Sequence, residues 1–406
     1  MSEWKCYKLN EISSLSNGIN FDKSAYTSGV KLIGVSDFKN RIHPDYDSLQ
    51  EVDSKVVKSG DYLDKGDIVF VRSNGNKELV GRCMMIDRDI PVTYSGFCIK
   101  LRLKDKKIFD PVFFNYLFKT RQFKKSMTGT AVGANIQNLS QSRLGSCEVN
   151  VPDIEIQKEI ATILSRYDSL IENYQKQIKL LEEAAQRLYK EWFVDLHFPG
   201  HEHTKIVDGV PEGWEKRKIS DVCDTIGGGT PSTKVLSYYE NGTISWVTPT
   251  DITKNNSLCL LSTEKKITQE GLEHSSAKML PVETILMTSR ASVGYFGICD
   301  FEVCTNQGFI SCVPFDNNFQ MYLLYNLMNR VEEIRIKAGG STYLEISKNV
   351  FRYFDIICPT DDLVNEFQQK AHQLLERMRM ISKQIRLLTE ARDRLLPKLM
   401  SGEIAV

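Results

Sequence analysis

The sequence lacks several features that mark common classes of protein. Lysine plus arginine and aspartate plus glutamate each total 52, so the 406-residue chain has no net charge to attract nucleic acid or membranes. Any charged binding surface must therefore be local. No stretch approaches about 18 uninterrupted apolar residues, and the N-terminal segment MSEWKCYKLNEISSL does not resemble a signal peptide. These absences predict a soluble cytoplasmic protein that makes no membrane contact.

Paired cysteines are also missing. The ten cysteines are scattered between Cys6 and Cys358, and none forms a CxxC pair. This spacing argues against a zinc ribbon or a redox dithiol, and it predicts reduced thiols buried as small apolar side chains. His197, His201 and His203 could be metal ligands, but no carboxylate or cysteine cluster accompanies them, and solvated histidines in a linker are the simpler interpretation.

Local motifs of catalysis are absent as well. The sequence contains no GxxxxGK[ST] phosphate loop, no GxSxG turn, no HExxH zinc motif and no Asn/Asp-Pro-Pro-aromatic motif of an amino-methyltransferase. The segment IGGGTPST (226–233) predicts a tight turn with glycines at positive φ. The acidic residues of PDIEIQK (152–158) suit a helix N-terminus. We therefore expect no bond chemistry, no cofactor and no metal, although an unrecognised enzyme remains an alternative.

An internal repeat dominates the sequence. KQIKLLEEAAQRL (176–188) returns 207 positions later as KQIRLLTEARDRL (383–395), with nine of the thirteen residues identical. An offset of 210 relates Trp4, Lys8 and Leu9 to Trp214, Lys218 and Ile219. The chain is therefore predicted to consist of two copies of one unit.

The first part of each copy is predicted to be mainly β. Short β-rich runs such as KLIGVS, DIVFVRS, GTISWVT and TILMTS are bounded by glycine, asparagine and aspartate. GDIVFVRS resembles ETILMTSR, and SGFCI (95–99) resembles QGFIS (307–311). Residues 113–125 and 321–337 are predicted to be matching helices. The ends of the copies are more alike than their middles, which suggests one scaffold presenting two different surfaces.

The second part of each copy is predicted to be one long helix. Apolar residues recur at steps of three and four from Ile156 to Trp192 and from Leu363 to Leu399, with Arg392 interrupting the second series. Asp153 and Thr360 each follow a proline and are suitable N-caps. Each helix could pack on its own β-rich domain, but two matching helices favour an antiparallel coiled coil that spaces the domains. A helix of about 40 residues is about 60 Å long.

These patterns predict an α+β fold with two pseudo-repeated, mixed and mainly β domains and two long helices in an antiparallel coiled coil. The expected boundaries are a first domain at 1–151, a central helix at 152–194, a linker at 195–213, a second domain at 214–358, and a C-terminal helix and tail at 359–406. The linker contains two prolines and three glycines up to Gly213 and has no apolar period.

The whole chain resembles the specificity subunit of type I restriction-modification enzymes. The resemblance rests on the two diverged units with proline-led helices, on AAQRLYKEWFVDLHFPGHE at the centre and RDRLLPKLMSGEI at the end, and on GGGTPS, ISWVTPTDI, SRASVG and TNQGF in the second unit. It implies a non-catalytic reader of double-stranded DNA in which each domain recognises half of a split, asymmetric site. It also implies that the helices set the spacer and dock two methyltransferase subunits that carry S-adenosylmethionine, while separate restriction and translocase subunits carry ATP hydrolysis and cleavage.

Polar loops are the candidates for base contact. Arginine suits guanine and asparagine suits adenine in the major groove, whereas ordinary turn chemistry is the alternative for each loop. The candidates are Arg72, Asn74, Asn76, Lys77, Asn135, Gln137, Thr230, Ser289, Arg290, Asn306, Gln307, Thr342 and Tyr343. Because Arg72 precedes a serine whereas Arg290 follows one, we expect the two domains to read different bases.

Basic stretches could supply phosphate contacts or could be solvated helix faces; they are KDKK (104–107), KTRQFKK (119–125), and Arg330 with Arg335 and Lys337. Two rival functions remain open at this point. One is a solitary DNA-binding regulator without restriction partners, and the other is a coiled-coil scaffold, which would show no salt-dependent binding to duplex DNA.

Overall fold

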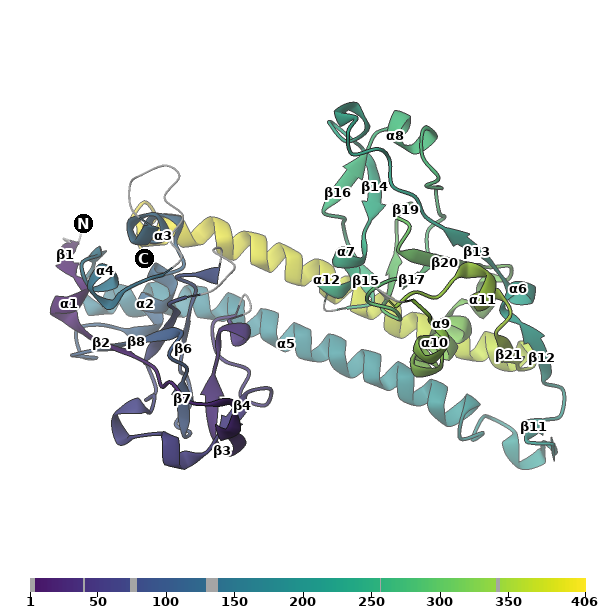
Figure 1. Ribbon diagram of the computed structural model, residues 1–406, viewed down its shortest axis with the longest axis horizontal. Helices are drawn as coiled ribbons and strands as arrows, with labels where there is room; N and C mark the ends of the chain where they lie inside the picture. The colour runs from purple at the N-terminus through teal and green to yellow at the C-terminus, as the bar shows by residue number, and fades with distance from the viewer. Residues whose placement is uncertain (1–3, 39–40, 74–78, 129–137, 256, 341–343) are drawn as a thin grey trace. The chain divides into compact units, whose positions relative to one another are not determined.

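The protein is described by a computed structural model covering residues 4–38, 41–73, 79–128, 138–255, 257–340 and 344–406. The chain forms two compact units, the first made of Met1–Ile171 with Leu388–Val406 and the second of Glu172–Leu387. Two long helices, α5 (Ile154–Phe193) and α12 (Asp361–Met400), each contribute residues to both units (Figure 1).

The first unit is built on two small sheets. Its strands are β1 (Lys5–Lys8), β2 (Ser13–Asn17), β3 (Tyr26–Ile33), β4 (Gln50–Val52), β5 (Ile68–Val71), β6 (Cys83–Met85), β7 (Val92–Tyr94), β8 (Cys98–Leu103) and β9 (Glu148–Val151). Its short helices are α1 (Leu9–Ile12), α2 (Pro111–Leu117), α3 (Arg121–Thr128) and α4 (Gln141–Gly145). The sheets have the orders β2-β8-β5-β6 and β4-β3-β7, and β1 pairs with β9.

The second unit repeats this plan. Its strands are β12 (Glu215–Lys218), β13 (Cys223–Gly227), β14 (Ile244–Val247), β15 (Cys259–Leu260), β16 (Lys265–Ile267), β17 (Ile285–Thr288), β18 (Phe296–Cys299), β19 (Cys304–Thr305), β20 (Phe309–Pro314) and β21 (Asp355–Cys358), preceded by the short pair β10 (Ile206–Val207) and β11 (Val210–Pro211). Its helices are α6 (Ile219–Val222), α7 (Pro249–Thr253), α8 (Gln269–Glu273), α9 (Gln320–Asn329), α10 (Val331–Lys337) and α11 (Lys348–Arg352). The sheets are ordered β13-β20-β17-β18-β15 and β16-β14-β19.

The central strand of each larger sheet is buried on both faces, which explains its uninterrupted apolar sequence. In β5, Ile68 and Phe70 join the core that includes α2, whereas Val69 and Val71 join the core shared with β3 and β7. Successive side chains of a strand point to opposite faces, so a strand covered on both faces must be apolar throughout. The equivalent strand β17 is also fully buried and is apolar up to its last residue, Thr288.

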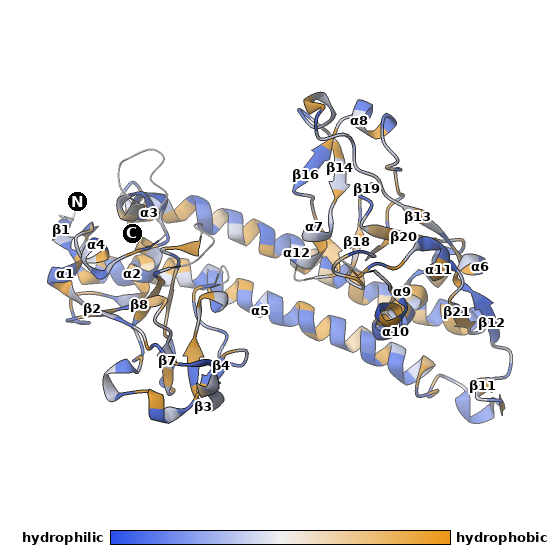
Figure 2. Ribbon diagram, in the orientation of Figure 1, coloured by the Kyte–Doolittle hydropathy of each residue, from blue (hydrophilic) through white to orange (hydrophobic). Residues whose placement is uncertain are grey.

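The long helices run antiparallel and pack together in each unit. In the second unit, Tyr189 and Trp192 of α5 both lie against Phe367 of α12, with ring centroids 6.0 Å apart in each case. Polar and apolar residues alternate along both helices (Figure 2). The helices begin immediately after Asp153 and Thr360, as the sequence predicts, and the mixed, mainly β fold with a paired helical element is confirmed.

The first unit joins the two helices differently, through a buried polar group. Arg392 of α12, which interrupts the predicted apolar series, donates through Nη1 to the carboxylate of Asp168 on α5. The same carboxylate accepts a hydrogen bond from the hydroxyl of Tyr116 on α2. Arg392 therefore fills its place in the helix interface because its charge is paired there.

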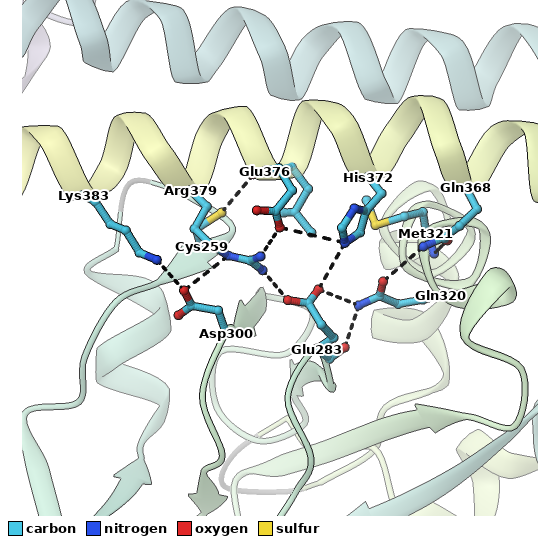
Figure 3. A network of polar contacts seen from close by, with 11 residues as sticks. Cys259, Glu283, Asp300, Gln320, Met321, Gln368, His372, Glu376, Arg379 and Lys383 are labelled. Carbon is cyan, nitrogen blue, oxygen red and sulfur yellow. Dashed lines mark hydrogen bonds and ion pairs between the residues drawn. The ribbon is translucent and has the colours of Figure 1, made fainter.

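In the second unit, α12 is attached to the β-rich part by a polar network (Figure 3). The nearly buried guanidinium of Arg379 donates to Glu283 and Glu376 and lies 3.9 Å from a carboxylate oxygen of Asp300. Lys383 donates to Asp300 over 2.6 Å. Glu283 precedes β17 and adopts a left-handed backbone with φ of 65°. Such strain in a non-glycine residue is retained only where its side chain is firmly held.

Two details of the sequence prediction are wrong. The helices predicted at 113–125 and 321–337 are each interrupted, between Leu117 and Arg121 and at Arg330. Thr120 causes the first restart, because its hydroxyl accepts the N–H of Phe123 over 3.2 Å as an N-cap does. Arg330 leaves the helical conformation at the second interruption, with φ of −106° and ψ of 18°.

The glycines of IGGGTPST do not adopt positive φ. They serve close packing instead: a Cβ on Gly228 would lie 2.1 Å from the carbonyl oxygen of Asn306, and one on Gly229 would lie 2.3 Å from the hydroxyl of Ser276. The prediction of a left-handed turn is therefore wrong, although glycine is still required.

Nine of the ten cysteines are buried as free thiols, and Cys6 is exposed. Burial raises the pKa of Cys98, Cys299 and Cys304 to about 12, which keeps these thiols protonated. Within the described ranges, no three His, Cys, Asp or Glu residues gather to hold a metal ion. No helix in the same ranges has both the length and the apolar character needed to cross a membrane.

Candidate nucleic-acid interface

Four candidate residues of the second unit, Ser289, Arg290, Asn306 and Gln307, lie where β17 ends and β20 begins. The N–H of Ser289, just after β17, donates to the carbonyl of Gly308 over 2.8 Å, and Ile346 donates to the carbonyl of Ser289 over 3.0 Å. Ser289 is buried by these neighbours, whereas Arg290 is exposed. The structure therefore brings the segments 289–290, 306–308 and 344–346 together along one edge.

Arg290 is held at this edge by the segment beside it. Its Nε lies 3.6 Å from a carboxylate oxygen of Glu345, and the two residues also form an isolated β-bridge. Ala291 follows in a left-handed conformation with φ of 60°. An exposed ion pair of this kind contributes little stability, so the guanidinium can exchange Glu345 for another acceptor at small cost.

Polar side chains from two loops meet next to Arg290. The hydroxyl of Thr230, in the glycine-rich loop after β13, is hydrogen-bonded to the side-chain oxygen of Gln307. The side-chain oxygen of Asn306 accepts the N–H of Gly308 over 2.9 Å, which fixes the start of β20. Thr230 and Gln307 are exposed and can turn toward a ligand.

In the first unit, Arg72 follows β5 at the corresponding edge. Its N–H donates to the carbonyl of Phe97 over 2.8 Å, and its own carbonyl accepts the N–H of Leu139 over 2.8 Å. Nη1 of Arg72 lies 3.5 Å from the carbonyl oxygen of Gly96, too far for a strong hydrogen bond. Seven further candidates lie outside the described residues: Asn74, Asn76, Lys77, Asn135, Gln137, Thr342 and Tyr343.

The backbone bonds show which positions of the two edges correspond. The backbone N–H groups of Arg72 and Ser289 both donate to the residue just before the adjacent strand of the sheet, β8 or β20. Their carbonyl groups both accept from a later segment, at Leu139 or Ile346. Ser73 forms a bridge with Asn138, as Arg290 does with Glu345. Arg72 and Arg290 therefore occupy neighbouring strand positions, and side chains at neighbouring positions point to opposite sides.

A family comparison agrees with the repeat. The model described as "Type I restriction modification DNA specificity domain" matches residues 1–183 and again residues 211–390.

The chain belongs to the type I restriction-modification specificity family.

Relatives of known designation match the whole chain or most of it. The specificity subunit of the type I restriction enzyme HindI from Haemophilus influenzae is 25% identical over 473 aligned residues, covering 100% of both chains. The specificity subunit of the enzyme MjaIX from Methanocaldococcus jannaschii is 29% identical over 72% of this chain and 68% of its own. The structure of an S subunit from M. genitalium superposes with a TM-score of 0.59 over 98% of this chain and 96% of its own, at 16% identity, and so shares the fold.

At this edge, the alignment of the two specificity domains by their backbone hydrogen bonds differs by one residue from the alignment by sequence identity. SGF (95–97) and QGF (307–309) align by identity, but the bonds from Arg72 and Ser289 pair Phe97 with Gly308. Consequently Phe97 is 61% exposed, whereas Phe309 is 2% exposed. A shift of one residue moves a side chain to the other face of a strand, which sequence similarity alone does not reveal.

Most basic residues proposed for phosphate contact are instead engaged within the specificity domains. Nζ of Lys119 donates to the carbonyls of Arg41 and Cys83, and burial lowers the pKa of this lysine. Arg330 donates to both carboxylate oxygens of Glu333. Arg335 donates to Glu332 over 2.7 Å. These cations hold helices in place, a role that residue type alone could not distinguish from DNA contact.

Proposed function

We propose that this chain is the DNA-reading subunit of a type I restriction-modification complex, in which each specificity domain reads one half of a split, asymmetric site. The reading domains are residues 1–151 and 214–358, the helical segments 152–194 and 359–406 set the spacer, and residues 195–213 link the halves. The chain itself performs no bond chemistry. Methylation, ATP hydrolysis and cleavage belong to methyltransferase and restriction subunits that assemble with it.

The observation that carries the proposal is the pair of corresponding edges. The same backbone bonds hold Arg72 and Ser289, yet the arginine, half-buried in the first domain and exposed in the second, comes from adjacent positions in the two domains. Specificity requires different base-edge contacts from a shared scaffold, and a one-position displacement of an arginine supplies that difference. A scaffold protein would have no reason to vary this edge while keeping its hydrogen bonds.

The side chains of these edges suit the bases of the major groove. Arginine bonds guanine through O6 and N7, asparagine and glutamine bond adenine, and hydroxyl groups bond either. We propose that Arg72, Arg290, Asn306, Gln307 and Thr230 contact bases, with Ser289 holding Arg290 through its backbone. The same role is proposed for Asn74, Asn76, Lys77, Asn135, Gln137, Thr342 and Tyr343.

The helices carry apolar residues suited to docking two copies of the same partner. Leu180 on α5 and Leu387 on α12 are related by the repeat offset of 207 and are exposed to 63% and 61%. Exposed leucines at repeat-related positions match the requirement that two identical methyltransferase subunits meet similar surfaces. Substituting aspartate at either position should release one methyltransferase subunit, which native mass spectrometry of the complex would detect.

Methylome sequencing tests the proposal. The chain is expressed with its cognate methyltransferase subunit in a host that lacks both, and the control host expresses the methyltransferase alone. We expect one new split motif carrying methylated adenine in the presence of the chain. Association of the two soluble proteins without any new motif would overturn the proposed function.

A further inference from the structure

Phe97 is the most exposed large apolar side chain among the described residues of the first unit, at 61%. It lies directly beside Arg72, because the carbonyl of Phe97 accepts the N–H of Arg72. A single exposed apolar residue is common on protein surfaces and needs no explanation by itself. Phe97 differs because the backbone that presents it is tightly constrained.

Four hydrogen bonds fix the turn that carries the ring. Cys98 donates to the carbonyl of Ser95 over 2.9 Å, which closes a four-residue turn with Phe97 at its third position. Ser95 donates to Ile33 over 2.9 Å and Gly96 to Ile19 over 2.7 Å, and the carbonyl of Phe97 accepts from Arg72 over 2.8 Å. The exposure of the ring is therefore a property of the fold and not of a loosely held loop.

The preceding glycine is closely packed in this arrangement. A Cβ on Gly96 would lie 2.0 Å from the side-chain oxygen of Asn20. The following residue, Cys98, is completely buried. The turn thus packs closely on both sides of Phe97 and leaves its ring outside.

The second specificity domain has Gly308 at the corresponding position. The two edges therefore differ in shape as well as in the position of their arginine. One edge presents an aromatic ring next to a cation, and the other presents a glycine next to the exposed side chain of Gln307.

Resting on the proposed function, we propose that Phe97 is a base-contacting residue of the first specificity domain, whose ring packs against a base of one half-site. Aromatic rings contact DNA by stacking on bases, by wedging into base steps or by covering the methyl group of thymine. All three contacts use the apolar ring and none uses charge. The neighbouring Arg72 anchors the same stretch of duplex by hydrogen bonds to a base or phosphate.

The test compares methylomes of the wild-type chain and the Phe97→Ala variant, each expressed with the methyltransferase subunit. We expect Phe97→Ala to relax one or two adjacent positions of a single half-site and to leave the other half-site unchanged. With purified complex, affinity for the wild-type motif should fall roughly tenfold, since a base–ring contact contributes about 1–3 kcal/mol. The slope of affinity against salt should not change, because no phosphate contact is lost.

Controls separate this role from others. Phe97→Trp should retain the motif, and Ile108→Ala, which removes another exposed apolar side chain of the same unit, should have no effect. An Arg290→Ala variant should alter the opposite half-site.

The arms of the experiment also identify the contact. Replacing thymine by uracil should reproduce the loss if the ring covers a methyl group, and 2-aminopurine fluorescence should rise on binding if the ring opens a base step.

An unchanged motif, an equal loss at both half-sites, or a loss of methyltransferase association in Phe97→Ala would overturn the inference. The proposed function would survive the first of these results, because the wild-type chain would still generate a split motif. Absence of any motif with the wild-type chain would instead reject the proposed function itself.

Discussion

The two units share a strand order, to which the second adds β15, but they attach their helices by different chemistry. The first unit joins α5 to α12 through Arg392, Asp168 and Tyr116, whereas the second uses aromatic packing around Phe367 and ties α12 to its sheet through Arg379. Strand order depends on the pattern of apolar residues, which tolerates many substitutions. By contrast, a substitution that removes one member of a buried ion pair leaves the other charge without a partner. Each unit therefore depends on its own set of polar partners.

The largest expected effect comes from Arg392→Met, which leaves the carboxylate of Asp168 buried without its cation. We expect the first unit to lose about 3–5 kcal/mol of stability, while the second is unaffected. Hydrogen exchange measured by mass spectrometry would show faster exchange in peptides of the first unit, including α2 and residues 154–171 and 388–406, and unchanged exchange in the second unit.

The double variant Asp168→Leu with Arg392→Met imitates the apolar interface of the second unit and should recover most of the loss. Lys179→Ala, which removes only an exposed ion pair with Glu183, is the matched control and should change stability by less than about 0.5 kcal/mol. If the double variant is as unstable as Arg392→Met, apolar side chains cannot replace the ion pair in the first unit.

A smaller effect is expected from Arg379→Met in the second unit. Glu283 and Asp300 retain some contact with water, so we expect a loss of about 2–3 kcal/mol, below that of a fully buried pair. Adding Glu283→Gly should return about 1 kcal/mol, because glycine relieves the left-handed backbone and removes the unpaired carboxylate. Thermal unfolding, monitored through hydrogen exchange in β17, measures both changes in stability. If the double variant is no more stable than Arg379→Met, backbone strain at Glu283 is not the cause.

Gly66 is the position of the first unit that corresponds to Glu283. Both precede the central strand, and both donate at the end of the strand next to it, Gly66 to Ile86, just after β6, over 2.8 Å and Glu283 to Cys299, the last residue of β18, over 2.9 Å. Gly66 has φ of +91°, and a Cβ there would lie 3.1 Å from Pro111 Cγ. We expect Gly66→Ala to cost about 1–2 kcal/mol in chemical denaturation, whereas Gly60→Ala, in open space, should be nearly neutral.

The smallest effect concerns the outer strand pair of the second unit. Hydrogen bonds from Lys218 and Lys216 lower the pKa of Asp355 to about 2, whereas Cys6 stands in the first unit where the repeat puts Lys216. The unfolded pKa is about 3.9, so this contribution is complete above about pH 4 and is lost as the pH falls toward 2. A carboxyl NMR titration should find that Lys216→Ala with Lys218→Ala moves the midpoint upward; an unchanged midpoint would contradict this assignment.

The sequence predicts the long helices well and the specificity domains only in outline. The starts at Asp153 and Thr360 follow from local signals, a proline and a capping residue before an apolar period. The alignment of Phe97 with Gly308 depends on pairing between distant strands, which no local signal encodes. Similarly, Lys119 and Arg330 look like surface cations in sequence, and only their partners reveal an internal role.

The pairing of Arg392 with Asp168 also makes the two helices, which are equal in length and related by the repeat, distinguishable. Their repeat partners are Ala185 and Leu375, both fully buried in the core of the second unit. If α5 paired with a second copy of itself, Asp168 would face an alanine, and a paired copy of α12 would set Arg392 against a leucine. We therefore expect each half of this chain to pair more favourably with the opposite half than with a copy of itself. If one half were replaced by the corresponding half from a related gene, the new half would need the residue that pairs with Asp168 or Arg392. Without that residue, the preference of each half for the opposite half would be lost.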